Sequence, residues 1–243
     1  MILADILFKQ GFGTRYDCRS IATSGAVSID GRELTDPDED FDLEGLVLTW
    51  RGMQWPVSDN VLIAMNKPTG YECSLKPSAH PSVMNLLPGP LRTRGVQPVG
   101  RLDWDTTGLL ILTNDGDFTD KMIHPRNEID KVYLARVKGI ATKENLRPLT
   151  RGVVIDGKKT QPAHYNIIKV DHEKNRSVVE LTIHEGRNHQ VKKMFESVGL
   201  IVDKLSRTRF GTLDLTGLRP GESRRLSKKE ISQLHNIAVN KVK

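Results

Sequence analysis

The chain has 243 residues, of which 37% are hydrophobic and 27% are charged, and its formal net charge is +6. This length and composition predict a globular protein with one large domain, or with a large and a small one. No apolar run is long enough to cross a membrane, and the first ten residues lack the basic region of a secretory signal. We therefore expect a cytoplasmic protein that does not associate with a membrane.

The charge is divided unequally along the chain. Residues 1–58 contain five Lys or Arg against ten Asp or Glu, whereas residues 59–243 contain thirty-one against twenty. The basic second part predicts a polyanionic partner, with nucleic acid as the leading candidate. A second interpretation remains open, because basic side chains also keep a surface soluble.

The first part predicts a small module of helices and short strands. Apolar residues at helical spacing near the start fit a short helix. Thr14 and Asp17 are spaced as a capping pair for a second helix, which we expect to end at Gly25. Residues 27–34 alternate around an Asp-Gly turn and predict a hairpin, and residues 47–50 predict one more strand. We place a domain boundary near residue 58, with domains at 1–58 and 59–243.

The second part mixes strand and helix patterns without regular alternation. Expected strands lie at residues 61–65, 109–113, 131–138 and 179–183, and expected helices at residues 119–124, 191–198 and from the capping box of Ser227 and Glu230 onward. This order favours an α+β domain with a mixed, largely antiparallel sheet and flanking helices over a doubly wound one.

A carboxylate precedes one of these strands in the stretch "GRLDWDTTGLLILTNDG". Asp103 stays ionised beside a buried strand only if a cation accompanies it, and Arg101 and Lys192 are the candidates. Taken alone, Asp103 is as well explained as a cap of the following turn. A glycosidase pair of Asp103 and Asp105 is a weaker alternative, because alternate residues on an extended chain project apart and no cluster of aromatic residues that could stack on a sugar surrounds them.

Four motifs appear in order: "MNKPTGY", "GRLDWDTTGLLILTNDG", "KVYLARVKG" and "EGRNHQVKKMF". Together they resemble the pseudouridine synthase superfamily, in particular its branch that acts on small-subunit ribosomal RNA. The stretch "GFGTRYDCRSIATSGAVSIDG" resembles the RNA-binding module of the ribosomal protein S4 type. The resemblance covers the chain from Met1 to about Ile237 and implies an S4-like domain followed by a catalytic domain.

The resemblance also implies roles for individual residues. Asp103 matches the catalytic nucleophile, Tyr133 matches the tyrosine that stacks on the base, and Lys192 matches the cation paired with the acid. The positions expected to bind the RNA substrate are Arg101, Arg187, Arg207, Arg209 and Lys67, with Arg15 and Arg19 on the S4-like module. We expect no metal site, because metal-ligand spacing is absent from Cys18 and Cys73 and from His124, His184 and His189, and we expect structural or RNA-contacting roles for the three histidines.

The activity that follows from the resemblance is isomerisation of a specific uridine in small-subunit ribosomal RNA, on a substrate that is naked RNA or an assembly intermediate. The reaction involves no redox change, so we expect no cofactor, and we expect a monomer. Two alternatives remain. The first is a synthase acting on large-subunit ribosomal RNA, and the second is an assembly factor that binds ribosomal RNA without turnover.

Overall fold

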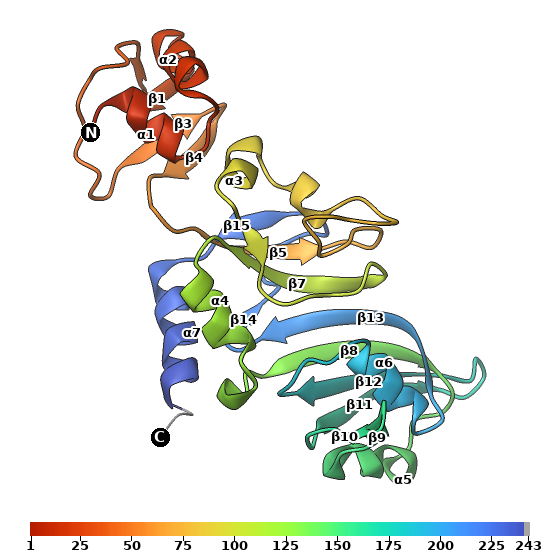
Figure 1. The fold of residues 1–243 in the computed structure, drawn as a ribbon. Coiled ribbons are helices and arrows are strands. Elements are labelled where there is room, and N and C mark those ends of the chain that lie inside the picture. Colours follow the sequence, from red (N-terminus) through yellow and green to blue (C-terminus); the bar gives the residue numbers. More distant parts are fainter. Residues whose placement is uncertain (241–243) are drawn as a thin grey trace. The chain divides into compact units, whose positions relative to one another are not determined.

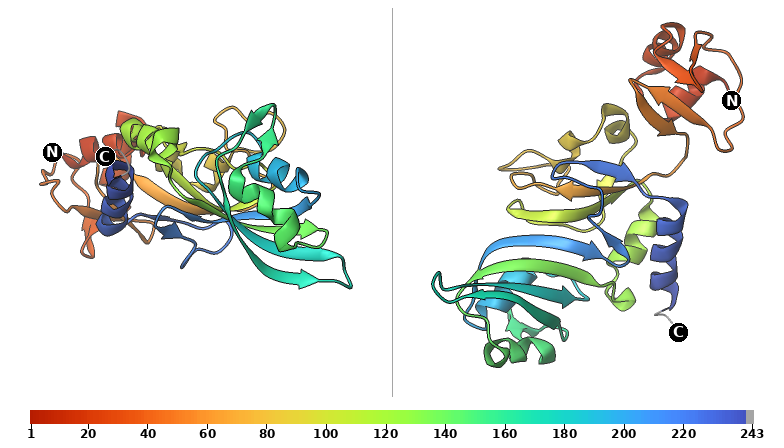
Figure 2. Two further views of the ribbon diagram at one scale, coloured as in Figure 1. Left: turned by 90° about the horizontal axis from the view of Figure 1, so that it is seen from below. Right: turned by 180° about the vertical axis from the view of Figure 1, so that it is seen from behind.

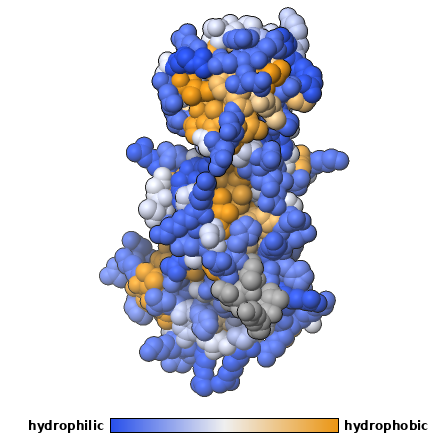
Figure 3. Space-filling model, turned by 90° about the vertical axis from the view of Figure 1, so that its left-hand side faces the viewer, coloured by the Kyte–Doolittle hydropathy of each residue, from blue (hydrophilic) through white to orange (hydrophobic). Residues whose placement is uncertain are grey.

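The computed structural model describes the backbone of residues 1–240 and the side chains of residues 1–237. The chain forms two compact units, of which the first combines Met1–Val61 with Leu87–Gln97 and the second combines Leu62–Leu86 with Pro98–Lys243 (Figure 1). Residues 241–243 of the expected second domain lie outside the described residues. Among the described residues, no helix is both long and apolar enough to span a membrane. Hydrophilic residues predominate on the face drawn in Figure 3.

The first unit contains two helices and an antiparallel sheet with the strand order β2-β1-β3-β4. These elements are α1 (Leu3–Lys9), α2 (Arg15–Thr23), β1 (Val27–Ile29), β2 (Arg32–Leu34), β3 (Val47–Trp50) and β4 (Met53–Pro56). The backbone N–H of Asp17 donates to the Thr14 hydroxyl, and the backbone N–H of Thr14 donates to the Asp17 carboxylate. The predicted capping pair, the hairpin and the strand over residues 47–50 are therefore confirmed.

A segment from later in the chain completes the first unit. It contains α3 (Gly89–Thr93), and the Thr93 hydroxyl donates to the carbonyl of Gly11. Arg94 donates to the Gln10 side chain at 2.9 Å. A Cβ at Gly11, where φ is +84°, would lie 2.3 Å from the carbonyl oxygen of Pro90, so this approach requires glycine. The boundary expected near residue 58 places this segment in the second domain instead. The sequence did not reveal its association with the first unit, because the contacts are polar and leave no periodic signal.

The second unit is built on a nine-stranded sheet whose main order is β11-β12-β8-β13-β7-β5-β15. The strands are β5 (Leu62–Lys67), β6 (Gln97–Pro98), β7 (Thr106–Thr113), β8 (Lys131–Lys138), β11 (His164–Asp171), β12 (Arg176–Ile183), β13 (Ile201–Phe210), β14 (Leu213–Asp214) and β15 (Ser223–Arg225). Along the main order only β13 and β7 pair in parallel. The expectation of a mixed, largely antiparallel α+β sheet is confirmed (Figure 2).

Helices and short turns flank this sheet. They are η1 (Val83–Leu86), α4 (Gly116–Ile123), η2 (Pro125–Asn127), α5 (Lys143–Leu146), η3 (Arg147–Arg151), α6 (Gln190–Glu196) and α7 (Lys228–Asn240), together with the small sheet of β9 (Val154–Ile155) and β10 (Lys158–Lys159). The Ser227 hydroxyl and Glu230 carboxylate form the predicted capping box of α7. Helices α4 and α7 lie together against the sheet (Figures 1 and 2).

The core beneath α4 and α7 fixes the position of β7. Phe118 and Met122 of α4 and Leu234 of α7 are buried with Leu109 and Ile111 of β7. Burial of such side chains stabilises the fold by roughly 1.5–3 kcal/mol each relative to exposure. Strand β7 is therefore rigid, and the residues just before it stand on a fixed edge.

Candidate active site

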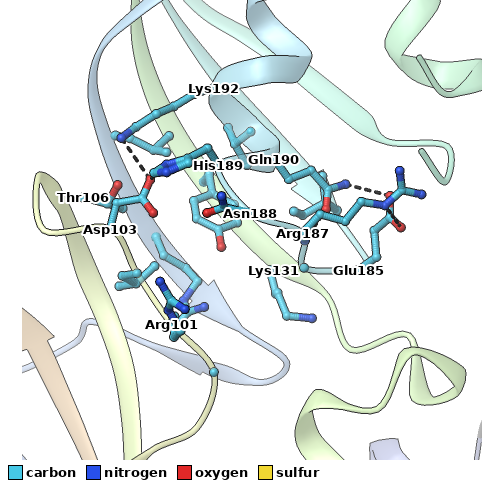
Figure 4. Close-up of a pocket in the computed structure, with 18 of the residues that line it drawn as sticks. Arg101, Asp103, Thr106, Lys131, Glu185, Arg187, Asn188, His189, Gln190 and Lys192 are labelled. Carbon is cyan, nitrogen blue, oxygen red and sulfur yellow. Dashed lines mark hydrogen bonds and ion pairs between the residues drawn. The ribbon is translucent and has the colours of Figure 1, made fainter. Parts of the chain in front are cut away.

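A cavity of about 500 Å³ opens in the second unit. Its walls come from the approach to β7, from β8, from the loop that leads into α6, and from β13 (Figure 4). The paired strands β8 and β13 place Tyr133 and Arg207 directly opposite each other. Residues that lie far apart in the sequence thus meet around one space, whose volume suits a small-molecule or nucleotide ligand.

Asp103 lies on one wall of this cavity, beside two nitrogen atoms (Figure 4). Its Oδ2 is 3.0 Å from Nζ of Lys192 and 2.8 Å from Nδ1 of His189. Lys192 also contacts Oδ1 of Asp105 at 2.7 Å. The structure therefore brings Asp103 and Lys192 together as the sequence predicts, and adds two side chains to the pair. Asp103 and Asp105 share one cation and do not project apart.

Two opposing effects set the charge of this pair. Burial raises the pKa of Asp103, but hydrogen bonds from Lys192 and His189 lower it by a larger amount. The resulting pKa is below the ordinary value of 3.8. Burial lowers the pKa of Lys192, but hydrogen bonds to Asp105 and Asp103 outweigh it, and the pKa is raised. Asp103 is therefore an ionised carboxylate, and Lys192 is an ammonium.

Lys67 holds the backbone that carries Asp103, which corrects its expected role as a substrate-binding residue. Its side chain is fully buried. Nζ donates at 3.0 Å to the carbonyl oxygens of Asp103, Thr106 and Pro68, and lies 3.3 Å from that of Trp104. Burial lowers the pKa of Lys67. The amine is directed at backbone carbonyls and not at the cavity, because the turn before β7 leaves several of them pointing inward.

Two residues of the cavity lining have a buried polar atom without a partner among the described residues. Arg207 is 2% exposed, and its Nε donates to the carbonyl of Leu109 at 2.8 Å, but its NH2 atom has no hydrogen bond. The hydroxyl of Thr106, at the start of β7, has none either. A buried polar atom left unpaired costs about 1–3 kcal/mol. Both atoms are buried away from solvent, so neither presents a free donor to the open cavity.

Aromatic and basic side chains form the rest of the lining. Tyr133 is 7% exposed and comes from β8, where its neighbour but one, Lys131, also faces the cavity. Burial, assisted by the nearby charge of Arg207, lowers the pKa of Lys131 to about 8. Arg101 is exposed at the cavity, where Figure 4 shows it below Asp103. The cavity thus combines one ionised acid with an aromatic ring and several cations.

The other predicted substrate-binding residues have different surroundings. Arg187 lines the cavity, but its guanidinium binds Glu185 and the backbone carbonyls of residues 158 and 159. Arg209 is exposed on β13 and is not part of the lining. In the first unit, Arg15 pairs with Asp5 at 2.6 Å and Arg19 pairs with Asp38 at 2.8 Å. For Arg187, Arg15 and Arg19, RNA would have to compete with these internal partners.

The sequence analysis did not place His189 beside Asp103. His189 precedes α6 with φ at +52°, a left-handed conformation that is uncommon for residues other than glycine. It lies three positions before Lys192, which is the spacing that puts two side chains on one face of a helix. This spacing is the signal in the sequence that could have predicted His189 beside Lys192 and Asp103.

The family model described as RNA pseudouridylate synthase matches residues 61–197, which include the whole wall that carries Asp103 and Lys192. This chain belongs to the RNA pseudouridine synthase family. The synthase is 36% identical over 236 residues to a Bacillus subtilis protein named ribosomal large subunit pseudouridine synthase B, and the match covers 97% of this chain and 96% of that relative.

Two further comparisons agree with this assignment. A putative chloroplastic ribosomal large subunit pseudouridine synthase of Arabidopsis thaliana is 30% identical over 246 residues, a match that covers 96% of this synthase and 60% of the plant protein. The crystal structure of a pseudouridylate synthase matches with a TM-score of 0.66 and 28% identity, covering 96% of this chain and 99% of that chain. The superfamily predicted from the four motifs is confirmed, and the mixed sheet has the pseudouridine synthase fold.

Proposed function

We propose that this synthase converts a uridine of ribosomal RNA to pseudouridine, with Asp103 as the nucleophile. The observation that carries the proposal is the ionised Asp103 beside Lys192 and His189, in a cavity that Tyr133 also lines. The reaction breaks the bond between N1 of uracil and C1′ of ribose, turns the base, and joins C5 to C1′. The proton on C5 leaves and N1 gains one, so no electrons are exchanged and the acid needs only to be ionised and well placed.

The structure is compatible with three uses of the carboxylate. Asp103 can attack C1′ of the ribose, add to C6 of the base, or remove a ribose proton on the way to a glycal intermediate. In each of them Lys192 and His189 keep the oxygen deprotonated and oriented. The substrate base must leave its stack at a cost of a few kcal/mol, and the ring of Tyr133 would offset part of this cost by stacking on it.

The exposed side chain of Arg101 gives the substrate a second point of attachment. We propose that its guanidinium binds a phosphate at the rim of the cavity. Arg209 is exposed and suits a contact to RNA outside the cavity. For Arg187 the support is weaker, because its donors already bind protein atoms.

The names of the relatives favour the large-subunit RNA as substrate. Two relatives that share 36% and 30% of their aligned residues with this chain are named large-subunit synthases. The four motifs led the sequence analysis to the small-subunit RNA instead. We take the large subunit as the main proposal, because the match to the large-subunit synthase of Bacillus subtilis covers 97% of this chain, whereas the four motifs lie in the second unit alone.

For the first unit we propose an S4-like role in orienting the RNA. Its two helices and hairpin follow the order that the S4-type pattern predicts. However, Asp5 and Asp38 neutralise Arg15 and Arg19. This unit therefore orients the RNA more than it adds to the affinity for RNA.

Mapping of pseudouridines by carbodiimide treatment tests the proposal in cells. Both ribosomal RNAs are compared between cells that lack the gene and the same cells complemented with it. We expect one or a few sites to vanish from the large-subunit RNA and to return on complementation. A site lost only from the small-subunit RNA would transfer the assignment to that subunit. Unchanged maps of both RNAs would overturn the ribosomal proposal.

A further inference from the structure

An exposed aromatic pair lies directly beside the catalytic acid. Trp104 stands between Asp103 and Asp105 in the chain, and 49% of it is exposed. Its ring stacks on the imidazole of His80, with centroids 4.3 Å apart and an interplanar angle of 23°. Neither residue belongs to the lining of the cavity. The pair is therefore a flat, partly open surface next to the site and outside it.

Two fixed loops hold this pair in place. The carboxylate of Glu72 accepts hydrogen bonds from the backbone N–H groups of Ser78, Ala79 and His80, at 2.8–3.0 Å. On the other side, the carbonyl of Trp104 accepts a hydrogen bond from the N–H of Gly70 at 2.8 Å and lies 3.3 Å from Nζ of Lys67. Both rings thus project from hydrogen-bonded backbone. An aromatic surface that is fixed before a ligand arrives loses little conformational entropy on binding.

The neighbouring chemistry indicates what this surface binds. We take Asp103 to act on a uridine inside the cavity. The Cα atom of Trp104 lies about 3.8 Å from that of Asp103, so the Trp104 ring is within reach of the nucleotides that flank the uridine. A nucleotide that leaves its stack also deprives its neighbours of a stacking partner. Aromatic side chains replace such partners irrespective of base identity. The second unit has an excess of basic residues, which suits RNA better than an apolar protein partner.

We propose that the Trp104–His80 pair is a stacking platform for a base adjacent to the target uridine. This inference rests on the proposed function, since it takes the reacting nucleotide to lie at Asp103. The platform positions the RNA strand and takes no part in the chemistry. Its removal should weaken RNA binding and raise KM, with a smaller effect on kcat.

The test begins with binding, which does not depend on turnover. The shortest ribosomal RNA fragment that the full chain protects from nuclease serves as probe, and its affinity is measured for the wild type, Trp104→Ala, Trp104→Phe and His80→Ala. We expect Trp104→Ala to weaken binding about 5- to 150-fold, the range for loss of one aromatic–base stack, and Trp104→Phe to retain most of the affinity. Leu75→Ala is the matched control, because Leu75 is a 58% exposed apolar residue on the same loop as His80, and it should bind as the wild type does.

A double-substitution cycle then identifies the contact. Each nucleotide of the fragment is replaced in turn by an abasic one, and binding is measured with the wild type and with Trp104→Phe and Trp104→Ala. At one position next to the target, the abasic change should weaken wild-type binding by the same factor as Trp104→Ala, and the two changes together should cost no more than either alone.

The outcomes separate the platform from the function. If the loss of affinity from Trp104→Ala adds to the loss from the abasic change at every position, Trp104 stacks on no base and the platform is overturned. Unchanged affinity of Trp104→Ala, or a loss shared by Leu75→Ala, would do the same. If Trp104→Ala does not fold, His80→Ala takes its place in the cycle, and Trp104→Phe serves as the variant that keeps an aromatic ring. A cycle that closes as expected while no uridine is converted would leave the platform standing and remove the proposed function.

Discussion

At the scale of single residues, the reactivity of the site depends on keeping a partly buried carboxylate ionised. Burial opposes ionisation of Asp103, and the hydrogen bonds of Lys192 and His189 outweigh it, so the pKa is lowered. For an acid with a lowered pKa, the stability gained by pairing is fully present above the ordinary value of 3.8 and is lost as the pH falls through the lowered value. Activity limited by this group should therefore be flat across neutral pH.

Replacing the cation tests this balance. In Lys192→Met the burial of Asp103 is opposed by His189 alone, so the pKa of Asp103 rises. We expect the acidic limb of kcat/KM to move to higher pH, and the activity at neutral pH to fall on the order of 100-fold. The control is Lys193→Met, which removes the adjacent lysine and its 2.6 Å pair with Asp156 outside the cavity. A pH profile of Lys192→Met that coincides with that of the wild type would refute the role given to Lys192.

Sequence motifs located the acid and its cation, but not the residues that position them. Asp103, Tyr133 and Lys192 lie at matched motif positions, and the structure places all three at one cavity. Lys67 was expected to bind the substrate, with the other basic residues near the matched motifs. Its actual partners are backbone carbonyls, which have no signature in a sequence. The contact of His189 with Asp103 was not predicted, because the left-handed backbone of His189 is set by the tertiary fold.

At the scale of elements, the parallel junction between β7 and β13 holds the two halves of the sheet together. Gly108 of β7 pairs with Arg207 of β13, and its φ is +105°. A Cβ at this glycine would lie 2.2 Å from the carbonyl oxygen of Arg207. This oxygen belongs to the backbone, so it cannot move away as the end of a flexible side chain could. The junction therefore requires glycine at this position.

Gly108→Ala should accordingly damage the fold. We expect the free energy of unfolding to fall by about 3 kcal/mol or more, or the protein to be recovered unfolded, because the substitution combines a backbone clash with an unfavourable φ. Chemical denaturation followed by circular dichroism measures the change. Gly116→Ala is the control, since Gly116 begins α4 and has open space around its Cβ position. Similar stabilities for the two variants would contradict the packing described for this junction.

Clean alternation made some elements predictable and its absence hid others. Strand β8 was predicted with its observed bounds, because Tyr133, Ala135 and Val137 recur at every second residue and are all buried. Strand β13 was missed as a strand, although it lies in the middle of the sheet. Irregularities between residues 202 and 204 and between residues 207 and 209 break its alternation, and its basic residues were interpreted as contacts to RNA. The structure shows that one of these, Arg207, is buried.

At the scale of the whole molecule, the first unit is acidic and the second is basic. The first unit contains seven Lys or Arg against eleven Asp or Glu, and the second contains twenty-nine against nineteen. The basic unit also contains the cavity. Most of the affinity for RNA should therefore come from phosphate contacts of the second unit.

Such contacts release counterions, so binding should weaken steeply with salt. We expect the affinity for the nuclease-protected RNA fragment to fall at least about 100-fold between roughly 50 mM and 200 mM monovalent salt. Fluorescence anisotropy at a series of salt concentrations gives the slope. An affinity that stays constant over this range would mean that charge does not drive binding and that the basic excess serves solubility alone.

The central claim is that an ionised Asp103 carries out the isomerisation. The most direct measurement is release of tritium from ribosomal RNA labelled at C5 of its uridines, with the wild type and Asp103→Asn compared at equal RNA occupancy. The account predicts release by the wild type, none by Asp103→Asn, and RNA binding by both. Release by Asp103→Asn at a rate near that of the wild type would contradict it.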